Sequence, residues 1–251
     1  MRLFGLIGFP LGHSFSGKYF SGKFQREGIT DARYELFPIS DINAFPRLWQ
    51  QHPELQGLNV TIPYKEAVIP FLDHATQVVR STGACNCVHL ENGSLVGYNT
   101  DVVGFEQTLA PLLKPVHHKA LILGTGGASK AVAYVLDNMG IGWQFVSRAG
   151  GEGCLRYDQL LPATMKEYPL IINTTPLGMY PNVRDAPSLP YEAMSERNLL
   201  YDLVYNPPQT EFLKRGKERG AMTCNGAEML MIQAEESWRI WNAPVSDSPL
   251  P

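Results

Sequence analysis

An amide, a hydroxyl and an ammonium group lie close together in the segment LNVTIPYKE, residues 58–66. Alternation of apolar and polar residues predicts a short strand whose apolar face consists of Leu58, Val60 and Ile62. Asn59 and Thr61 then share the polar face, and Lys65 follows directly after the break that Pro63 makes. A solvated face of an edge strand would explain this pattern, and so would a binding site with a lysine at its end.

A glycine-rich turn lies between an apolar strand and a helical pattern in the second half of the chain. ALIL (120–123) is followed by GTGGAS (124–129) and then by apolar residues at helical spacing. In such a βαβ unit, Gly124 permits the tight turn and Gly126 lets the backbone approach a pyrophosphate at the helix N-terminus. The strand and helix around the glycines make this a much stronger signal than glycines alone. The segment predicts a dinucleotide site.

The end of the next strand indicates which dinucleotide is bound. NAD-binding proteins usually place an acidic residue there for the ribose hydroxyls, whereas an arginine suits a 2′-phosphate. This chain has Ser147 and Arg148, and no acid before Glu152. A hydroxyl and a planar cation can both donate to phosphate oxygens, so NADP is favoured over NAD.

A dinucleotide site in a chain that also carries a lone lysine after a short strand suggests hydride transfer, which needs a proton donor and polar groups that hold a polyol. Three further stretches supply candidates, namely GACNCV (83–88), GYNTDVVGF (97–105) and NGAEMLMIQAEESW (225–238). The CNC spacing is not that of a zinc site, and we expect no metal.

Composition excludes several other classes of protein. The 251 residues are 44% apolar and 18% charged, as in ordinary globular proteins, and the net charge of −3 offers no basic excess for nucleic acid. We expect no membrane helix, because no run of about 18 apolar residues is present. The four cysteines, in a chain whose start predicts a strand and turn instead of a signal peptide, indicate reduced thiols and a cytoplasmic protein.

Strand-like and helix-like segments alternate along the chain, which predicts an α/β fold. The first hundred residues contain RLFGLIG, a helix near 16–27, RYELFPI, a helix near 41–51, and LNVTIP. We predict two domains, a substrate domain of residues 1–101 with 226–251 and a Rossmann-type nucleotide domain of residues 102–225.

Together these segments resemble the shikimate dehydrogenase family, in the family's order and over nearly the whole chain. GFPLGHSFS is similar to its serine motif, NVTIPYKE to its lysine motif, GACNCV to its asparagine motif, GYNTDVVGF to its aspartate motif and GTGGASKA to its NADP loop. INTTPLGM (172–179), YDLVYNPPQT (201–210) and NGAEMLMIQ (225–233) complete the series.

The resemblance implies a role for residues in each motif. Lys65 would be the catalytic acid/base, paired with Asp101. The implied substrate-binding residues are Ser14, Ser16, Asn59, Thr61, Asn86, Tyr205 and Gln233. The implied cofactor-binding residues are Gly124, Thr125, Gly126, Gly127, Ala128, Ser147, Arg148, Thr174, Leu203, Gly226 and Met229.

The chain departs from the family pattern at several positions. After the paired serines it has Gly17, Tyr19 and Phe20 in place of the usual Pro and His-Asn. Cys87 replaces the usual Thr after Asn86. The segment AGGEGCLR that follows Arg148 is predicted to be flexible and to lack a close second cation, which would weaken recognition of the 2′-phosphate.

The function predicted from these residues is reversible, NADPH-dependent reduction of 3-dehydroshikimate to shikimate, a step toward chorismate and the aromatic amino acids. We expect small-molecule ligands only, with no nucleic acid or membrane partner, in a monomer or homodimer. Two alternatives are an NAD-using quinate/shikimate dehydrogenase and a non-catalytic NADP-binding sensor. An acid beside Arg148 would favour the first, and absence of Lys65 or Asp101 would favour the second.

Overall fold

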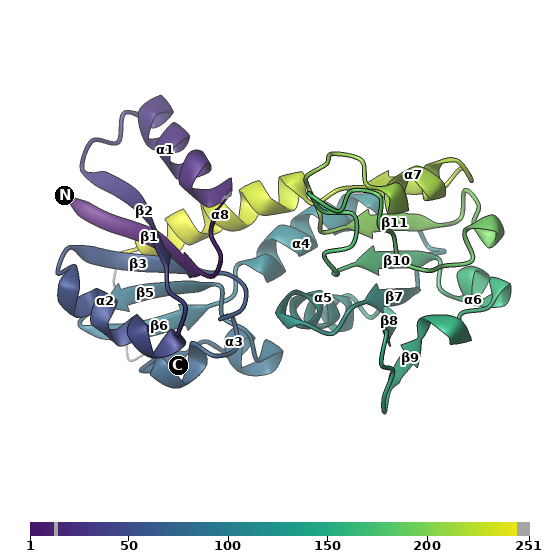
Figure 1. Ribbon diagram of the computed structural model, residues 1–251, viewed down its shortest axis with the longest axis horizontal. Coiled ribbons are helices and arrows are strands. Elements are labelled where there is room, and N and C mark those ends of the chain that lie inside the picture. The colour runs from purple at the N-terminus through teal and green to yellow at the C-terminus, as the bar shows by residue number, and fades with distance from the viewer. Residues whose placement is uncertain (13–14, 245–251) are drawn as a thin grey trace. The chain divides into compact units, whose positions relative to one another are not determined.

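The structure is a computed structural model that describes residues 1–12 and 15–244. The chain divides into two compact units, here called unit 1 (Met1–Val103 with Met231–Pro251) and unit 2 (Gly104–Leu230). The divisions fall inside two helices, α4 (Asp101–Leu109) and α8 (Ala227–Trp241), which the chain follows from one unit into the other (Figure 1).

Unit 1 is built on a mixed six-stranded sheet. Its elements are β1 (Arg2–Gly8), α1 (Phe15–Glu27), β2 (Ala32–Pro38), α2 (Phe45–Gln51), β3 (Leu55–Val60), β4 (His74–Ala75), α3 (Gln77–Thr82), β5 (Cys87–Glu91) and β6 (Ser94–Tyr98), with 3-10 turns at Ile42–Ala44 and Ile69–Phe71. The strand order is β2-β1-β3-β5-β6-β4. β1 runs parallel to both neighbours, and β5 runs antiparallel to β3 and β6.

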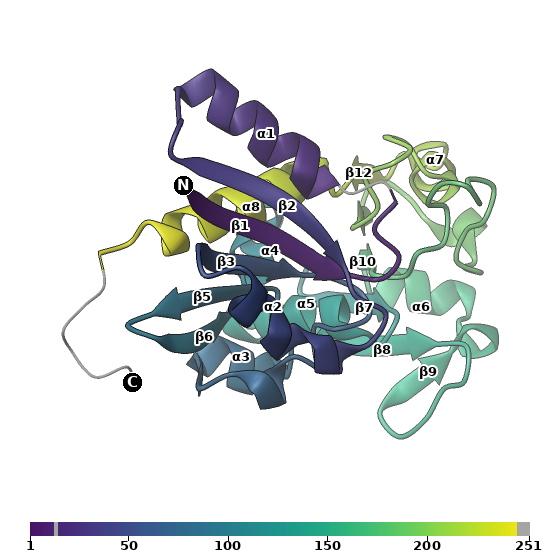
Figure 2. The same cartoon turned by 60° about the vertical axis from the view of Figure 1, so that its left-hand side comes forward.

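Two apolar layers cover the faces of this sheet. On one face, Leu58 and Val60 of β3 belong to a cluster with side chains from α2 and α3. On the other face, Phe4 of β1 packs with side chains from α1 and α8, including Trp241 (Figure 2). Side chains alternate along a strand, so Asn59 points to the α8 side.

The polar face of β3 is therefore buried beneath a helix. β3 has strands on both sides, and Asn59 is only 5% exposed, which excludes a solvated edge strand. The predicted strand runs too far, because β3 ends at Val60. Ile62, predicted on the apolar face, lies outside the sheet and is 73% exposed. A turn closed by the Tyr64 N–H to Thr61 O bond takes the chain away from the sheet.

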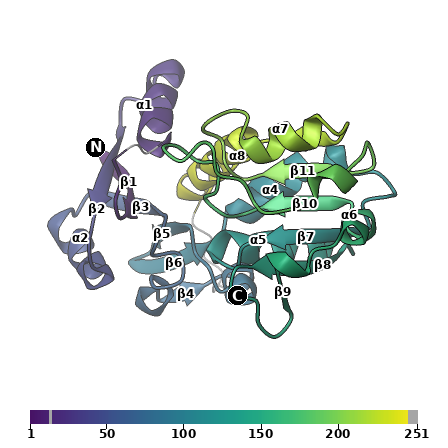
Figure 3. The same cartoon turned by 45° about the vertical axis from the view of Figure 1, so that its right-hand side comes forward.

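Unit 2 is a doubly wound, fully parallel sheet with α-helices between β7 and β8, between β9 and β10, and between β11 and β12. Its elements are β7 (Lys119–Leu123), α5 (Gly127–Asn138), β8 (Gly142–Ser147), β9 (Cys154–Arg156), α6 (Pro162–Glu167), β10 (Leu170–Asn173), β11 (Leu199–Asp202), α7 (Glu211–Lys217) and β12 (Met222–Cys224), with 3-10 turns at Ala110–Leu112, Tyr157–Gln159 and Tyr191–Ala193. The order β12-β11-β10-β7-β8-β9 reverses direction at β7, as in dinucleotide-binding sheets (Figure 3). The predicted α/β fold with a Rossmann-type sheet is confirmed.

The βαβ unit at the centre of this sheet follows from its sequence. The strand residues 120–123 are fully buried, since helices cover both faces of a parallel sheet. α5 buries Ala131, Val132, Val135 and Leu136 on one stripe. The turn between β7 and α5 thus lies at the carboxyl edge of the sheet, where ligands of such folds bind.

Candidate active site

An ion pair joins the lysine and the aspartate of unit 1. Lys65 follows β3, Asp101 is the first residue of α4, and the Lys65 ammonium donates to Asp101 Oδ2 at 2.5 Å. Their side chains are 19% and 10% exposed, so water screens the pair only partly. A carboxylate in the first turn of a helix is also favoured by the helix dipole. The structure thus supplies a charged proton donor with a fixed orientation.

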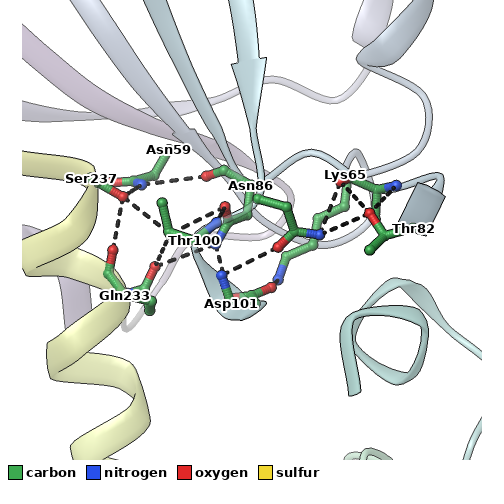
Figure 4. A network of polar contacts seen from close by, with 10 residues as sticks. Asn59, Lys65, Thr82, Asn86, Thr100, Asp101, Gln233 and Ser237 are labelled. Atoms are coloured by element: carbon green, nitrogen blue, oxygen red, sulfur yellow. Dashed lines mark hydrogen bonds and ion pairs between the residues drawn. The ribbon is translucent and has the colours of Figure 1, made fainter. Parts of the chain in front are cut away.

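Asn86 holds the other oxygen of that carboxylate. One of its amide hydrogens is donated to Asp101 Oδ1 at 2.8 Å and the other to Thr100 Oγ1 at 2.9 Å. Its own Oδ1 accepts the Thr100 backbone N–H at 2.7 Å. Both carboxylate oxygens of Asp101 are therefore bonded, one to Asn86 and one to Lys65 (Figure 4).

Asn59 connects this cluster to β2 and α8. Its Oδ1 accepts from the Tyr34 hydroxyl at 2.9 Å, while its amide donates to Ser237 Oγ at 2.9 Å and Asn86 O at 3.3 Å. Burial raises the pKa of the Tyr34 phenol well above its usual value, so this hydroxyl stays a donor. Asn59 is fixed by three elements of the fold.

The C-terminal helix contributes two polar side chains to the same network. Ser237 Oγ donates to the backbone oxygen of Gln233 at 2.9 Å and lies 3.3 Å from Thr100 Oγ1. Gln233 Oε1 lies 3.4 Å from Thr100 Oγ1 and 3.5 Å from Asn86 Nδ2 (Figure 4). Thus five predicted residues of unit 1 gather in one network, namely Asn59, Lys65, Asn86, Asp101 and Gln233.

Sequence reasoning missed three members of this network. Thr100 precedes Asp101, and Ser237 lies one helical turn after Gln233, so neighbourhood and helical spacing could have indicated both. Tyr34 lies on a distant strand, and no motif pointed to it. Thr61 follows β3 at its end, and Ser16 lies in the first turn of α1. Ser14 lies outside the described residues.

The departures from the family pattern have structural partners. The Tyr19 hydroxyl donates to Glu235 of α8, and Phe20 is buried in the cluster between α1, α8 and the sheet. Glu235 also accepts from Lys23 Nζ at 2.7 Å. Burial raises the pKa of the Cys87 thiol, so the group that replaces a threonine hydroxyl stays protonated and apolar.

In unit 2, the glycine turn leaves the first turn of α5 open. Gly124 has φ +107°, and a Cβ there would lie 2.7 Å from Thr174 Oγ1. Gly126 precedes α5 without a side-chain cap, and nothing lies within 4 Å of the place where its Cβ would be. The N–H groups of Gly127 and Ala128 therefore lie at a helix start with room for an anion, and Thr125 beside them is exposed.

The other predicted cofactor residues lie at the carboxyl edge of the same sheet. Ser147 ends β8 and Arg148 after it is exposed. Beyond β11, Gly226 meets Leu203 so closely that a Cβ would lie 2.2 Å from the Leu203 carbonyl oxygen. Met229 is buried. Tyr205 is half-buried, and burial raises the pKa of its phenol.

A buried carboxylate ties three segments of this edge together. Asp202 is fully buried and accepts from Asn173 Nδ2 at 2.9 Å, from the Val204 N–H at 3.0 Å and from Thr210 Oγ1 at 2.5 Å. Burial raises the pKa of Asp202 to about 6, although these three donors oppose the shift. No cation is among its hydrogen-bonding partners in the part of the chain that the structure describes.

A dinucleotide-type sheet together with a lysine–carboxylate pair defines a nicotinamide-dependent oxidoreductase as the class of protein. Residues 6–88 match the family model described as the shikimate dehydrogenase substrate binding domain. The NADP(+) shikimate dehydrogenase of Desulforamulus reducens is 35% identical, with 96% of this chain and 91% of that protein covered.

Solved structures agree with this match. Shikimate 5-dehydrogenase from Thermus thermophilus in complex with NADP(H) and shikimate has a TM-score of 0.85 and 30% identity, covering 98% of this chain and 95% of that one. Quinate dehydrogenase from Corynebacterium glutamicum in complex with NAD has a TM-score of 0.84 and 25% identity, with the same coverage. The chain belongs to the shikimate dehydrogenase family.

Within residues 1–12 and 15–244, no helix is long and apolar enough to cross a membrane. In the same ranges, no group of three or more His, Cys, Asp or Glu side chains is placed to hold a metal ion.

Proposed function

We propose that this protein catalyses the reversible, NADP-dependent reduction of 3-dehydroshikimate to shikimate. The observation that carries the proposal is the ion pair of Lys65 and Asp101, held by Asn86 in a chain that also has an open glycine turn at a dinucleotide-type sheet. A binding protein that only senses the nucleotide has no need for a half-buried, oriented proton donor.

Lys65 acts as the proton donor in the reducing direction. Asp101 fixes the position of the ammonium group, and one of the three N–H groups of Lys65 makes this bond. The others can reach a substrate oxygen, which takes a proton as it becomes an alcohol. Such a positioned acid contributes about 10²–10⁴-fold to a rate. In the oxidising direction the Lys65 amine acts as the base and accepts the proton of the alcohol.

The remaining residues of unit 1 bind the substrate. Asn59 and Asn86 already donate both amide hydrogens to the protein, so each can offer the substrate only its Oδ1 as an acceptor, which Tyr34 shares in Asn59 and Thr100 shares in Asn86. They suit substrate hydroxyl groups, which can donate. Ser14, Ser16 and Thr61 supply hydroxyls for the carboxylate and ring, and Gln233 completes the set from unit 1. Tyr205, which belongs to unit 2, is a further proposed substrate-binding residue.

Unit 2 holds the cofactor. When bound, the reduced cofactor would supply a hydride from its nicotinamide. Gly124, Thr125, Gly126, Gly127 and Ala128 would bind the pyrophosphate, because the uncapped N–H groups and open space there fit an anion. Ser147 and Arg148 would bind the 2′-phosphate. Thr174, Leu203, Gly226 and Met229 would line the nicotinamide end.

The assay that tests this proposal follows absorbance of the reduced cofactor with shikimate or quinate and with NADP or NAD. We expect the highest specificity constant for shikimate with NADP. A preference for quinate and NAD would establish the alternative activity. No turnover with any pair of substrate and cofactor would support the alternative of a non-catalytic NADP-binding sensor.

A variant separates the acid/base role from binding. Lys65→Met should lower turnover about 10²–10⁴-fold and leave the NADP dissociation constant unchanged, because Lys65 belongs to the substrate unit. Lys18→Met, on the exposed surface of α1, is the matched control. A Lys65→Met enzyme with more than about a tenth of the original turnover would contradict the assignment.

We also propose that the protein is cytoplasmic and acts as a monomer or homodimer. Its four cysteines are all free, which suits a reducing compartment. Fractionation of cells and light scattering of the purified protein test these two points.

A further inference from the structure

The short strand β9 brings a second arginine to the carboxyl edge of β8. β9 pairs in parallel with β8, and the register sets Arg156 opposite Ser147. In the segment after Arg148, which was predicted to be flexible, residues 149–153 form a loop and Cys154–Arg156 form β9. Carboxyl ends of parallel strands meet at one edge, so a residue remote in sequence becomes a neighbour of the predicted 2′-phosphate site.

The side chain of Arg156 is directed along this edge by its contacts. Register partners point to the same face of a sheet, so Arg156 shares a face with Ser147. Its stem lies against Gly150, where a Cβ would come 2.5 Å from Arg156 Cγ. The Gly150 N–H in turn donates to Ser147 Oγ at 3.0 Å. Arg156 thus packs on the same turn that Ser147 closes.

Arg148 directly follows Ser147 and begins the loop between β8 and β9. Its charge acts on the phenol of Tyr157, the residue directly after Arg156, and opposes the burial that raises the pKa of that phenol to about 12. The loop between β8 and β9 therefore has Ser147 and Arg148 at its start, and Arg156 packs on its Gly150. A phosphate dianion fits this arrangement, because each guanidinium donates in a planar fork.

We propose that Arg156 is the second cation for the 2′-phosphate of NADP and a determinant of the choice of NADP over NAD. The proposal rests on the cofactor assignment made above. It adds a residue that lies eight positions beyond Arg148 in sequence, where no local motif indicates it.

Asp158 limits this interaction. Its carboxylate accepts from Arg156 Nε at 3.0 Å and from Nη2 at 2.9 Å. The two side chains are 52% and 67% exposed, so water screens the pair and a phosphate can compete for the guanidinium. Asp158 also repels the phosphate. The preference for NADP is therefore weaker than two unpaired arginines would give.

The experiment measures binding of NADP and NAD to the purified full-length protein by calorimetry, without substrate. Arg156→Gln should raise the dissociation constant of NADP about tenfold. It should change that of NAD by less than about twofold, since NAD has no 2′-phosphate. Asp158→Asn should increase the affinity for NADP and leave the affinity for NAD unchanged. Arg219→Gln, which removes an exposed arginine from the turn after α7, is the matched control. Added salt should lower the affinity for NADP less steeply in Arg156→Gln than in the unchanged protein.

The unchanged NAD affinity shows that each variant is folded. If Arg156→Gln binds NADP like Arg219→Gln while Arg148→Gln loses the preference, the role of Arg156 is overturned and the NADP assignment stands. If the unchanged protein binds NAD more tightly than NADP, the cofactor assignment fails together with this inference.

Discussion

Replacing Asp202 by asparagine should remove a pH-dependent loss of stability from unit 2. Asp202 is a buried carboxylate with three hydrogen-bond donors. Asparagine can accept from Asn173 and Val204 through Oδ1 and can donate through Nδ2 to Thr210 Oγ1, so the change keeps the three contacts. It removes only the charge.

The magnitude follows from the pKa of the native carboxyl group, which burial raises from 3.8 to about 6. A raised pKa means that the native state binds the proton more tightly than the unfolded state. Stability is therefore greatest below about pH 4 and falls as pH rises toward 6. A shift of about two units corresponds to a loss of about 3 kcal/mol at neutral pH. Asp202→Asn should show no such fall.

The assay is urea unfolding between pH 4 and 7.5, followed by the fluorescence of Trp143, the one tryptophan between residues 104 and 230. The stability difference between Asp202→Asn and the unchanged protein should grow by about 3 kcal/mol over this range. Asp185→Asn, at an exposed site in unit 2, should show a small, nearly constant difference. A constant difference for Asp202→Asn, or one that reverses sign, would refute the reasoning.

Two further substitutions test the packing of unit 1. Gly17→Ala should stabilise the unit by about 0.4–1 kcal/mol in urea unfolding, because alanine loses less backbone entropy than glycine on folding. Its Cβ would also meet Leu36 at an ordinary contact distance of 3.5 Å. A loss of stability would contradict this prediction. Ser237→Ala should cost about 1–3 kcal/mol, because it leaves a buried amide hydrogen of Asn59 unpaired. Ser21→Ala removes the same kind of bond to the preceding helical turn at an exposed site, and an equal effect of the two changes would rule out the network as the cause.

The parts of the fold that the sequence predicted depend on local signals. The glycine turn at Gly124, the apolar strand before it and the helix after it are set within one short segment, and all three were confirmed. The predicted strand at residues 58–62 was misplaced, because the contacts of β3 with β1 and β5 decide where pairing stops.

The candidate site shows the same division between local and distant information. Lys65 and Asp101 were predicted as a pair from motifs, and the ion pair is present, while their chemical roles stay a prediction. Tyr34 could not be predicted, since it reaches the network from another strand, and the proposed role of Arg156 likewise depends on strand pairing. Register is a property of the assembled sheet, and single-sequence patterns do not specify it.

The buried position of Trp241 has a consequence for the order in which the protein folds. A Cβ at Gly57 would lie 2.2 Å from Trp241 Nε1, and that nitrogen donates to Val88 O at 3.0 Å, so the sheet of unit 1 is completed only by α8. During synthesis, residues 104–230 leave the ribosome as one contiguous segment before the part of α8 that belongs to unit 1, residues 231–241. Unit 2 can therefore fold first. Until α8 is made, the aromatic side chains on the α8 side of the unit 1 sheet stay uncovered. We expect nascent chains that stop before Met231 to be held by chaperones through Phe4 and Phe20.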